Sequence, residues 1–352
     1  MNRPLNPLTV LLVIAVLAVP SVAAISPGSD GTGEFISYYD QLDANRRAVY
    51  DAVNSAGTDI LSVTVDLPVK LTFSSYDSDD AKLFAVNAAR SIADDVFDVL
   101  RLVSPLAYWG WGLTVSDHTA NIEVMNNDVS LISLTVTVNL SGYPADPDTD
   151  GSETVQKMLD EIKSAVDGFS TESTSTRDKV RDINNYITNL VTYDPNAGDT
   201  GGSLYSHDAY GALGDPSHYA VCDGYSKAFL LLCEKEGIEC VVVLGTAIPS
   251  MVNHAWNYVK MDNGLWYAMD VTWNDDSDNA YFLMGGKSFF VSHQQGVYLE
   301  YGLIPHPFAS PPISDSDYES SGMGYQQYEW ILAVAIVVLM SVALYMHARG
   351  KN

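Results

Sequence analysis

A cysteine at the start of a predicted helix is the first residue in this sequence that could do chemistry. Cys222 precedes a run that ends at Gly237, a residue typical of a helix C-cap. The apolar positions of this run recur at helical spacing: Tyr225, Ala228, Phe229, Leu232 and Cys233. A thiol at a helix N-terminus meets unpaired backbone N–H groups and the positive end of the helix dipole, which favour the thiolate. Cys222 is therefore a candidate nucleophile, and the alternative is that it packs as a small buried hydrophobic residue.

A histidine and an aspartate follow on the two arms of one predicted hairpin. His254 opens the first strand, Asp270 lies in the second, and a turn signal at 262–264 separates them. With a three-residue loop Asp270 is the diagonal neighbour of His254, and with a five-residue loop it lies directly opposite. Both registers put the two side chains on one sheet face, whereas a two-residue loop puts them on opposite faces.

Together these three residues fit a nucleophile with its general base. An imidazole held by a carboxylate on one nitrogen can exchange a proton with a thiol on the other. The alternative is three unrelated residues: a core cysteine, a strand-end histidine and a surface aspartate.

The composition excludes several classes of function. The 352-residue chain carries a net charge of −26, which argues against nucleic acid and against docking on an anionic membrane surface. An acidic surface instead suits solubility outside the cell. Three cysteines are too few for a disulfide framework. The triad residues could in principle ligate a metal, but no compact ligand spacing such as CxxC or HExxH is present, so we expect neither a metal nor a cofactor.

The two ends of the chain predict a route to the membrane. An apolar run at 8–19 is followed by Val22 and Ala24 at signal-peptidase positions, which fits a secretory signal cleaved after Ala24, with an uncleaved signal anchor as the alternative. A second apolar run at 330–346 is long enough with its flanks to span a bilayer. Positive charge at 347–351 then places the C-terminus in the cytoplasm and the rest of the chain outside.

Seven segments are expected, with an α+β fold overall. They are a signal peptide (1–24), a linker (25–33), an N-terminal α+β region (34–142), a domain with the candidate residues (152–300), a Pro/Ser/Asp-rich spacer (304–328), a transmembrane helix (329–346) and a cytoplasmic tail (347–352). Helices are predicted at 38–53, 79–103, 153–169, 177–191 and from Cys222 onward. Strands are predicted at 61–73 in two pieces, and at 108–115, 121–125, 131–140, 237–246, 254–261, 265–273 and 281–284.

Four blocks resemble the prokaryotic transglutaminase-like superfamily. They are Ala209-Tyr210-Gly211-Ala212-Leu213, the run from Val221 to Phe229, His254-Ala255-Trp256-Asn257, and the run from Trp266 to Asn274. Over about 177–290 the resemblance implies a papain-like core, in which a helix carrying the cysteine packs on an antiparallel sheet carrying the histidine and aspartate. It implies that Cys222 is the nucleophile, His254 the general base and acid, and Asp270 the residue that orients it.

The resemblance also implies the reaction. A thiolate attacks an amide of a peptide or protein substrate to give a thioester, which water hydrolyses or an amine converts to a cross-link. The oxyanion would be stabilised by the Cys222 backbone N–H and one further donor, for which Trp256, Tyr210 and Tyr219 are candidates with packing as the alternative role. We thus expect an extracytoplasmic enzyme held in the cell membrane by one C-terminal helix. The alternative is a cell-surface binding or architecture protein that uses the same fold without turnover.

Overall fold

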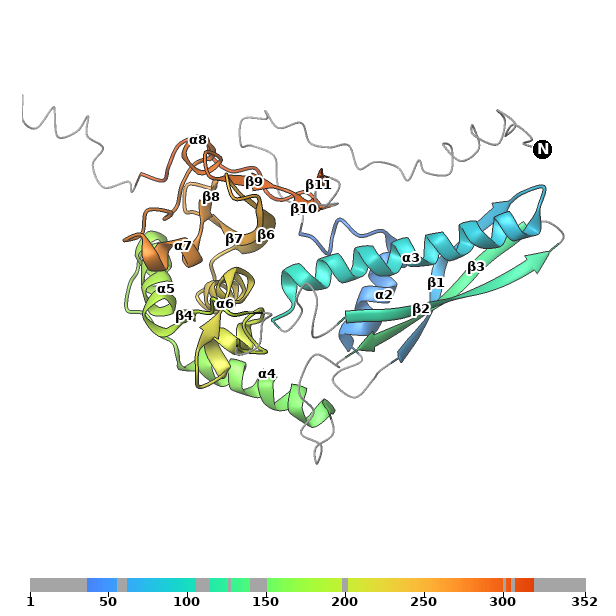
Figure 1. Ribbon diagram of the computed structural model, residues 1–352, viewed down its shortest axis with the longest axis horizontal. Coiled ribbons are helices and arrows are strands. Elements are labelled where there is room, and N and C mark those ends of the chain that lie inside the picture. Colours follow the sequence, from blue (N-terminus) through green and yellow to red (C-terminus); the bar gives the residue numbers. More distant parts are fainter. Residues whose placement is uncertain are drawn as a thin grey trace, which may run out of the picture.

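The computed structural model describes residues 37–55, 62–105, 114–125, 128–139, 151–197, 202–299, 302–304 and 308–319. They form two neighbouring parts, one with a three-stranded sheet and one with a four-stranded sheet (Figure 1). Helices and largely antiparallel sheets of this kind make the fold α+β, as predicted. Four predicted segments lie outside the described residues: the signal peptide, the linker, the transmembrane helix and the cytoplasmic tail. Within the described ranges, no helix has the length and apolar character needed to cross a bilayer.

In the first part, two helices cover one face of an antiparallel sheet with the strand order β1-β3-β2. Its elements are α2 (Ala44–Ser55), β1 (Ser62–Ser74), α3 (Ser78–Val103), β2 (Thr114–Met125) and β3 (Asp128–Asn139). Asp77 caps α3, because its side chain accepts the backbone N–H of Asp79. Ala81, Ala85 and Ala89 are fully buried on one face of α3, and such small side chains let a helix lie close to a sheet.

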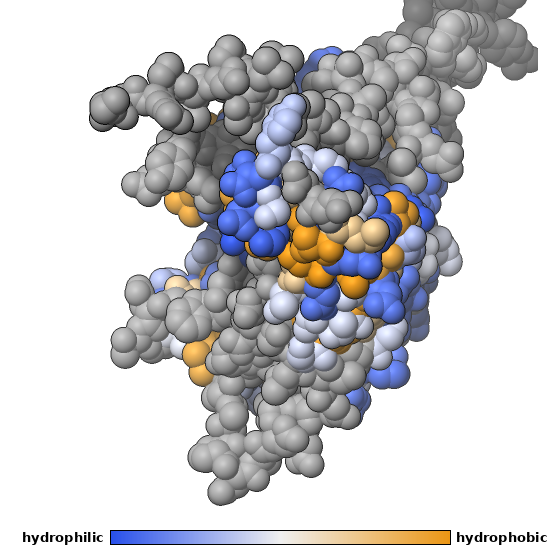
Figure 2. All heavy atoms as spheres, turned by 90° about the vertical axis from the view of Figure 1, so that its right-hand side faces the viewer, coloured by the Kyte–Doolittle hydropathy of each residue, from blue (hydrophilic) through white to orange (hydrophobic). Residues whose placement is uncertain are grey.

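Hydrophobic residues also gather on the outer end of this first part, with hydrophilic residues around them (Figure 2). The exposed large hydrophobic side chains here include Val69, Leu83, Val86, Val124 and Met125. Exposed apolar residues are ordinary on protein surfaces. These exposed side chains alone therefore do not indicate a function.

The second part is built around α6 and an antiparallel sheet with the strand order β8-β7-β6-β9. Its elements are α4 (Gly151–Gly168), α5 (Thr176–Leu190), β4 (Thr192–Tyr193), the π-helix η1 (Tyr210–Gly214), β5 (Tyr219–Ala220), α6 (Cys222–Lys235), β6 (Cys240–Ala247), β7 (Val252–Lys260), β8 (Trp266–Met269), α7 (Val271–Asp276), α8 (Gly286–Phe289), β9 (His293–Gln295), β10 (Val297–Leu299) and β11 (Gly302–Ile304).

Helix α6 forms the centre of the core in this part. Its residues Tyr225 and Phe229 pack in one cluster with Ile183 of α5 and Val259 of β7. The helix ends before Gly237, whose φ of +71° is the left-handed conformation that favours glycine at a C-cap. The helix predicted from Cys222 is therefore confirmed, together with its end.

The two parts share a hydrophobic cluster. Val99 and Leu102, near the C-terminal end of α3, pack with Leu230 of α6 and Val242 of β6. The hydroxyl of Tyr38 donates to the backbone carbonyl of Val242 at 3.0 Å. The first part is thus packed on the second along α3.

Some predicted elements are wrong in extent. The helix predicted at 38–53 begins only at Ala44. The strand predicted at 265–273 ends at Met269, because Asp270 caps α7 by accepting the backbone N–H of Trp273. The strand predicted at 281–284 is reduced to an isolated bridge between Met284 and Ala268.

Part of the predicted spacer is held against the second part. The backbone N–H of Ser314 donates to the carbonyl of Trp266 at 2.8 Å, and that of Tyr318 donates to the carbonyl of Leu283 at 3.0 Å. We call residues 308–319 the strap, because these bonds tie the segment to the domain instead of leaving it as a free linker.

Candidate active site

Cys222 is the first residue of α6 and is partly exposed. The N-cap residue is Val221, whose side chain cannot accept a hydrogen bond from the first turn of the helix. The backbone N–H groups at this end of α6, where Cys222 lies, are therefore not capped by that side chain. Cys222 is a free thiol, as are Cys233 and Cys240. The structure thus places the predicted nucleophile at a helix N-terminus, as the sequence indicated.

His254 and Asp270 are hydrogen-bonded, with 2.8 Å between Nε2 of His254 and Oδ2 of Asp270. The hairpin pairs Lys260 with Trp266 and closes through a bond from Met261 N–H to the Leu265 carbonyl. This is the register of the three-residue loop, in which Asp270 is the diagonal neighbour of His254. Asp270 itself lies just beyond the strand, at the cap of α7.

Both members of this pair are buried, and each shifts the pKa of the other. Burial opposes the charged imidazole, but the nearby carboxylate of Asp270 and the thiol of Cys222 outweigh it and raise the pKa of His254 to about 10. Burial likewise opposes the charged carboxylate, but His254 and a second histidine, His293, lower the pKa of Asp270 to about 2. At neutral pH the pair is therefore an imidazolium beside a carboxylate.

The structure brings all three predicted residues together. Since Asp270 occupies Nε2 of His254, Nδ1 is the ring nitrogen left to exchange a proton with Cys222. A contact with the Cys222 thiol is among the interactions that raise the pKa of His254. The ring of Trp273 stacks on the imidazole at 5.1 Å between centroids, which fixes its plane.

Sequence reasoning missed His293. Its Nε2 donates to Oδ2 of Asp270 at 3.0 Å, on the same oxygen that holds His254. His293 lies on β9, beyond the matched blocks and 23 residues from Asp270, so no spacing pattern in the sequence pointed to it. One ligand atom from each of His254, Asp270 and His293 lies within 4.8 Å of the others, so these three could also hold a metal ion.

A second histidine–aspartate pair lies beside Cys222. Nδ1 of His207 contacts both carboxylate oxygens of Asp223 at 3.0 and 3.1 Å. Burial opposes the charged form of His207, but Asp223 outweighs it and raises the pKa of His207. Lys227, one turn further along α6, is buried, and burial lowers its pKa. This pair was also not predicted, although Asp223 is the residue next to the nucleophile.

The candidates for a second oxyanion donor have different surroundings. Trp256 is completely buried and packs edge-on against Phe289. The Tyr210 hydroxyl donates to Glu161 at 2.8 Å. The bond to Glu161 occupies Tyr210. The indole N–H of Trp256 is buried without a hydrogen-bond partner among the described residues, and Tyr219 is exposed, so both remain candidates.

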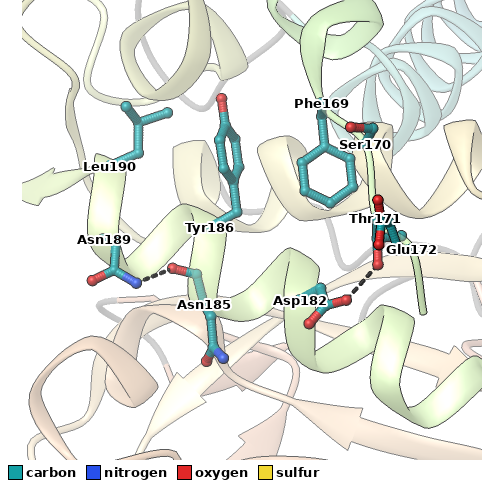
Figure 3. A pocket seen from close by; sticks show the side chains of 9 residues that line it. All are labelled: Phe169, Ser170, Thr171, Glu172, Asp182, Asn185, Tyr186, Asn189 and Leu190. Carbon is teal, nitrogen blue, oxygen red and sulfur yellow. Dashed lines mark hydrogen bonds between the residues drawn. The ribbon is translucent and has the colours of Figure 1, made fainter.

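A separate cleft of about 560 Å³ lies along α5 (Figure 3). It is lined by Phe169, Ser170, Thr171, Glu172, Asp182, Asn185, Tyr186, Asn189 and Leu190. Phe169 and Tyr186 point into it side by side, with ring centroids 5.0 Å apart. None of Cys222, His254 and Asp270 lines this cleft, so it is not the place where the predicted chemistry would occur.

Comparison with known proteins finds one family that resembles the core. Residues 163–271 match the sequence profile of the Transglutaminase-like superfamily. Cys222, His254 and Asp270 all fall inside this match. No curated protein matches the chain.

Three solved structures resemble parts of the chain at low identity. One is a TGase, 19% identical with a TM-score of 0.29; the alignment covers 60% of this chain, which spans 50% of that protein's length. A candidate cysteine protease from Cytophaga hutchinsonii is 15% identical with a TM-score of 0.25, covering 60% of this chain and 74% of its own. A candidate protease from Parabacteroides distasonis is 14% identical with a TM-score of 0.24, covering 46% and 40%.

Proposed function

Because residues 163–271 match the Transglutaminase-like superfamily, we propose that this protein is a cysteine enzyme acting on amide bonds of peptides or proteins. Cys222 is the nucleophile, His254 is the general base and acid, and Asp270 orients His254. The observation that carries the proposal is the convergence of a helix-terminal thiol with a buried, hydrogen-bonded imidazole–carboxylate pair.

The reaction follows from these positions. In the resting ion pair the proton of the Cys222 thiol already lies on Nδ1 of the His254 imidazolium. The thiolate sulfur forms a bond to the amide carbonyl carbon, and the carbonyl π electrons move to the oxygen. The tetrahedral intermediate then breaks its C–N bond, and the imidazolium gives its proton to the leaving amine. Water or a second amine attacks the resulting thioester, His254 takes the proton of that nucleophile, and the sulfur leaves and regains a proton. Water yields a carboxylic acid, and an amine yields a new amide.

Asp270 supports each of these steps through charge and geometry. Its bond to Nε2 fixes the tautomer of His254, so that Nδ1 faces the thiol. The raised pKa of His254 favours the imidazolium, which is the form that accompanies a thiolate. These features support turnover over the alternative, a binding or architecture protein in which the domain holds its ligand without reaction.

Alkylation by iodoacetamide at pH 7 tests this function inside a single chain. Cys240 is also partly exposed and serves as the internal reference thiol, whereas Cys233 is buried. We expect Cys222 to react at least about tenfold faster than Cys240, because it lies at the N-terminus of α6 beside His254. We expect His254→Gln to bring the two rates together. Equal rates in the unmodified protein would favour the non-catalytic alternative.

We further propose that the domain works outside the cell, anchored by the apolar segment at 329–346. The support is the pattern of the sequence: a signal-like N-terminus, an apolar C-terminal run and positive charge after it. Protease added to intact cells should digest the core, and the membrane fraction should retain the C-terminus. Recovery of the whole chain in the soluble fraction contradicts the anchor but leaves the chemistry untouched.

A further inference from the structure

Asp270 is held by three hydrogen bonds from three different elements. Oδ2 accepts from His254 of β7 at 2.8 Å and from His293 of β9 at 3.0 Å, and Oδ1 accepts the backbone N–H of Trp273 in α7 at 3.1 Å. From this geometry we propose that His293 is a positioning residue of the active site, which keeps the Asp270 carboxylate aligned with His254. The inference rests on the function proposed above and extends the triad by one residue.

The bond from His293 decides the orientation of the carboxylate. Asp270 is completely buried, so water does not replace a lost partner easily, and an unpaired buried oxygen is costly. Trp273 fixes one oxygen and His293 fixes the other, so the carboxylate cannot rotate about its last bond without breaking one of them. His254 then meets an oxygen whose position is set before substrate binds.

The second nitrogen of His293 determines which proton it carries. A carboxylate only accepts hydrogen bonds, so Nε2 must be protonated to donate to Asp270. Nδ1 lies 2.9 Å from Oγ of Ser292, whose hydroxyl can donate to an unprotonated nitrogen. Burial lowers the pKa of His293, while that of His254 is raised.

Aromatic packing holds the His293 ring in this position. Phe289 stacks on it with centroids 3.9 Å apart and an angle of 11° between the rings. Trp256 packs against it edge-on at 5.1 Å, and Trp273 lies at 4.4 Å. A packing role and a positioning role therefore predict different outcomes for different replacements.

Two substitutions separate these roles. His293→Phe keeps an aromatic ring for stacking on Phe289 but removes the donor to Asp270. His293→Gln removes the ring, but its amide N–H reaches about as far as Nε2 and can still donate. For a positioning residue we expect His293→Phe to lower kcat about tenfold or more at unchanged KM, and His293→Gln to retain more activity than His293→Phe. Higher activity in His293→Phe than in His293→Gln would overturn the proposal.

Alkylation of Cys222 separates this inference from the proposed function. Asp270→Asn is the reference for a lost orienting carboxylate, and His218→Asn is a matched control, because His218 contacts a backbone carbonyl in another loop. If the unmodified protein shows no His254-dependent alkylation, the proposed function fails. If Asp270→Asn slows alkylation and His293→Phe equals the control, only the role of His293 fails.

Two measurements on the unmodified protein cover the case in which both variants unfold. In ¹⁵N spectra of the histidine rings, we expect His293 to be neutral with its proton on Nε2. A neutral ring with the proton on Nδ1 overturns the proposal, because it cannot donate to Asp270. The protein should also be exposed to zinc alone. Binding of one zinc ion per chain, with loss of the Nε2 proton signals of both His254 and His293, would overturn the proposal in favour of a metal site.

Discussion

Two histidine–aspartate pairs lie near the start of α6, yet they differ in what they can do for the thiol. His254 and Asp270 come from the sheet side, are both buried, and include Cys222 among the groups that set the pKa of His254. His207 and Asp223 pair just as closely, but the imidazole is 31% exposed. Burial lowers its pKa, and Asp223 outweighs burial and raises it. The two pairs therefore differ in how far the imidazole is removed from water, and only the deeply buried imidazole of His254 is held by a carboxylate that a second histidine also contacts.

Removing the charge of Asp270 should have the largest effect on this comparison. Asp270→Asn can present its amide N–H to Nε2 of His254, which favours the wrong tautomer, so we expect turnover to fall about 10³-fold or more. Single-turnover kinetics with a peptide amide substrate measure this. A loss of less than tenfold would mean that the His254–Asp270 pair is no more specialised than the His207–Asp223 pair.

A substitution at Gly245 tests the packing that supports the His254–Asp270 pair. A Cβ at this position would meet a ring carbon of Trp256 at 2.1 Å and the carbonyl oxygen of Gln294 at 2.4 Å. Gly245→Ala should therefore destabilise the fold by about 1–3 kcal/mol through overpacking, and it should slow Cys222 alkylation, because Trp256 packs beside His254 and His293. Urea unfolding measures the first effect. An unchanged unfolding midpoint contradicts the tight packing described here.

The His254–Asp270 pair should make the free energy of unfolding depend on pH. The folded pKa of His254 is raised from 6.5 to about 10, so its contribution is complete below about pH 6.5 and is lost as the pH rises through about 10. The pKa of Asp270 is lowered from 3.8 to about 2, so its contribution is lost as the pH falls through about 2.

Urea unfolding of the unmodified protein and Asp270→Asn at pH 6, 8 and 10.5 tests this dependence. We expect the advantage of the unmodified protein to be largest near pH 6 and smallest above pH 10. A constant difference over this range would mean that the pair does not exchange a proton as the two shifts require.

The His207–Asp223 pair should show the smallest effect. His207→Gln keeps a donor for Asp223, so we expect a stability loss of about 1 kcal/mol at most and turnover within about threefold of the unmodified protein. Thermal unfolding and the same kinetic assay measure both. A loss of turnover as large as that of Asp270→Asn would place both pairs in the reaction.

Local patterns in the sequence predicted the elements that depend on local chemistry. The helical spacing after Cys222 and the apolar periodicity of 79–103 correspond to α6 and α3. Hairpin loops of three or five residues put His254 and Asp270 on one face of the sheet, and a loop of two residues puts them on opposite faces. The structure has the three-residue loop, which brings them together. Residue types and short spacings are sufficient for such features.

The remaining features depend on contacts between distant segments. Val271, Thr272 and Trp273 have β-branched and aromatic side chains, which favour a strand, but the cap by Asp270 turns them into α7. His293 reaches Asp270 because β9 pairs with β6, at the opposite edge of the sheet from β8. Neither the cap nor this pairing leaves a periodic signal in the sequence.

The strap also limits how far the domain can stand from a membrane. Because residues 308–319 are bonded to β8 and to the loop after α7, a tether to the proposed span at 329–346 would begin only after the strap. Residues 320–328 reach about 30 Å at most when fully extended. Under the proposed anchoring, the enzyme would therefore stay within a thin layer at the membrane surface. Substrates farther from the membrane would have to diffuse to it.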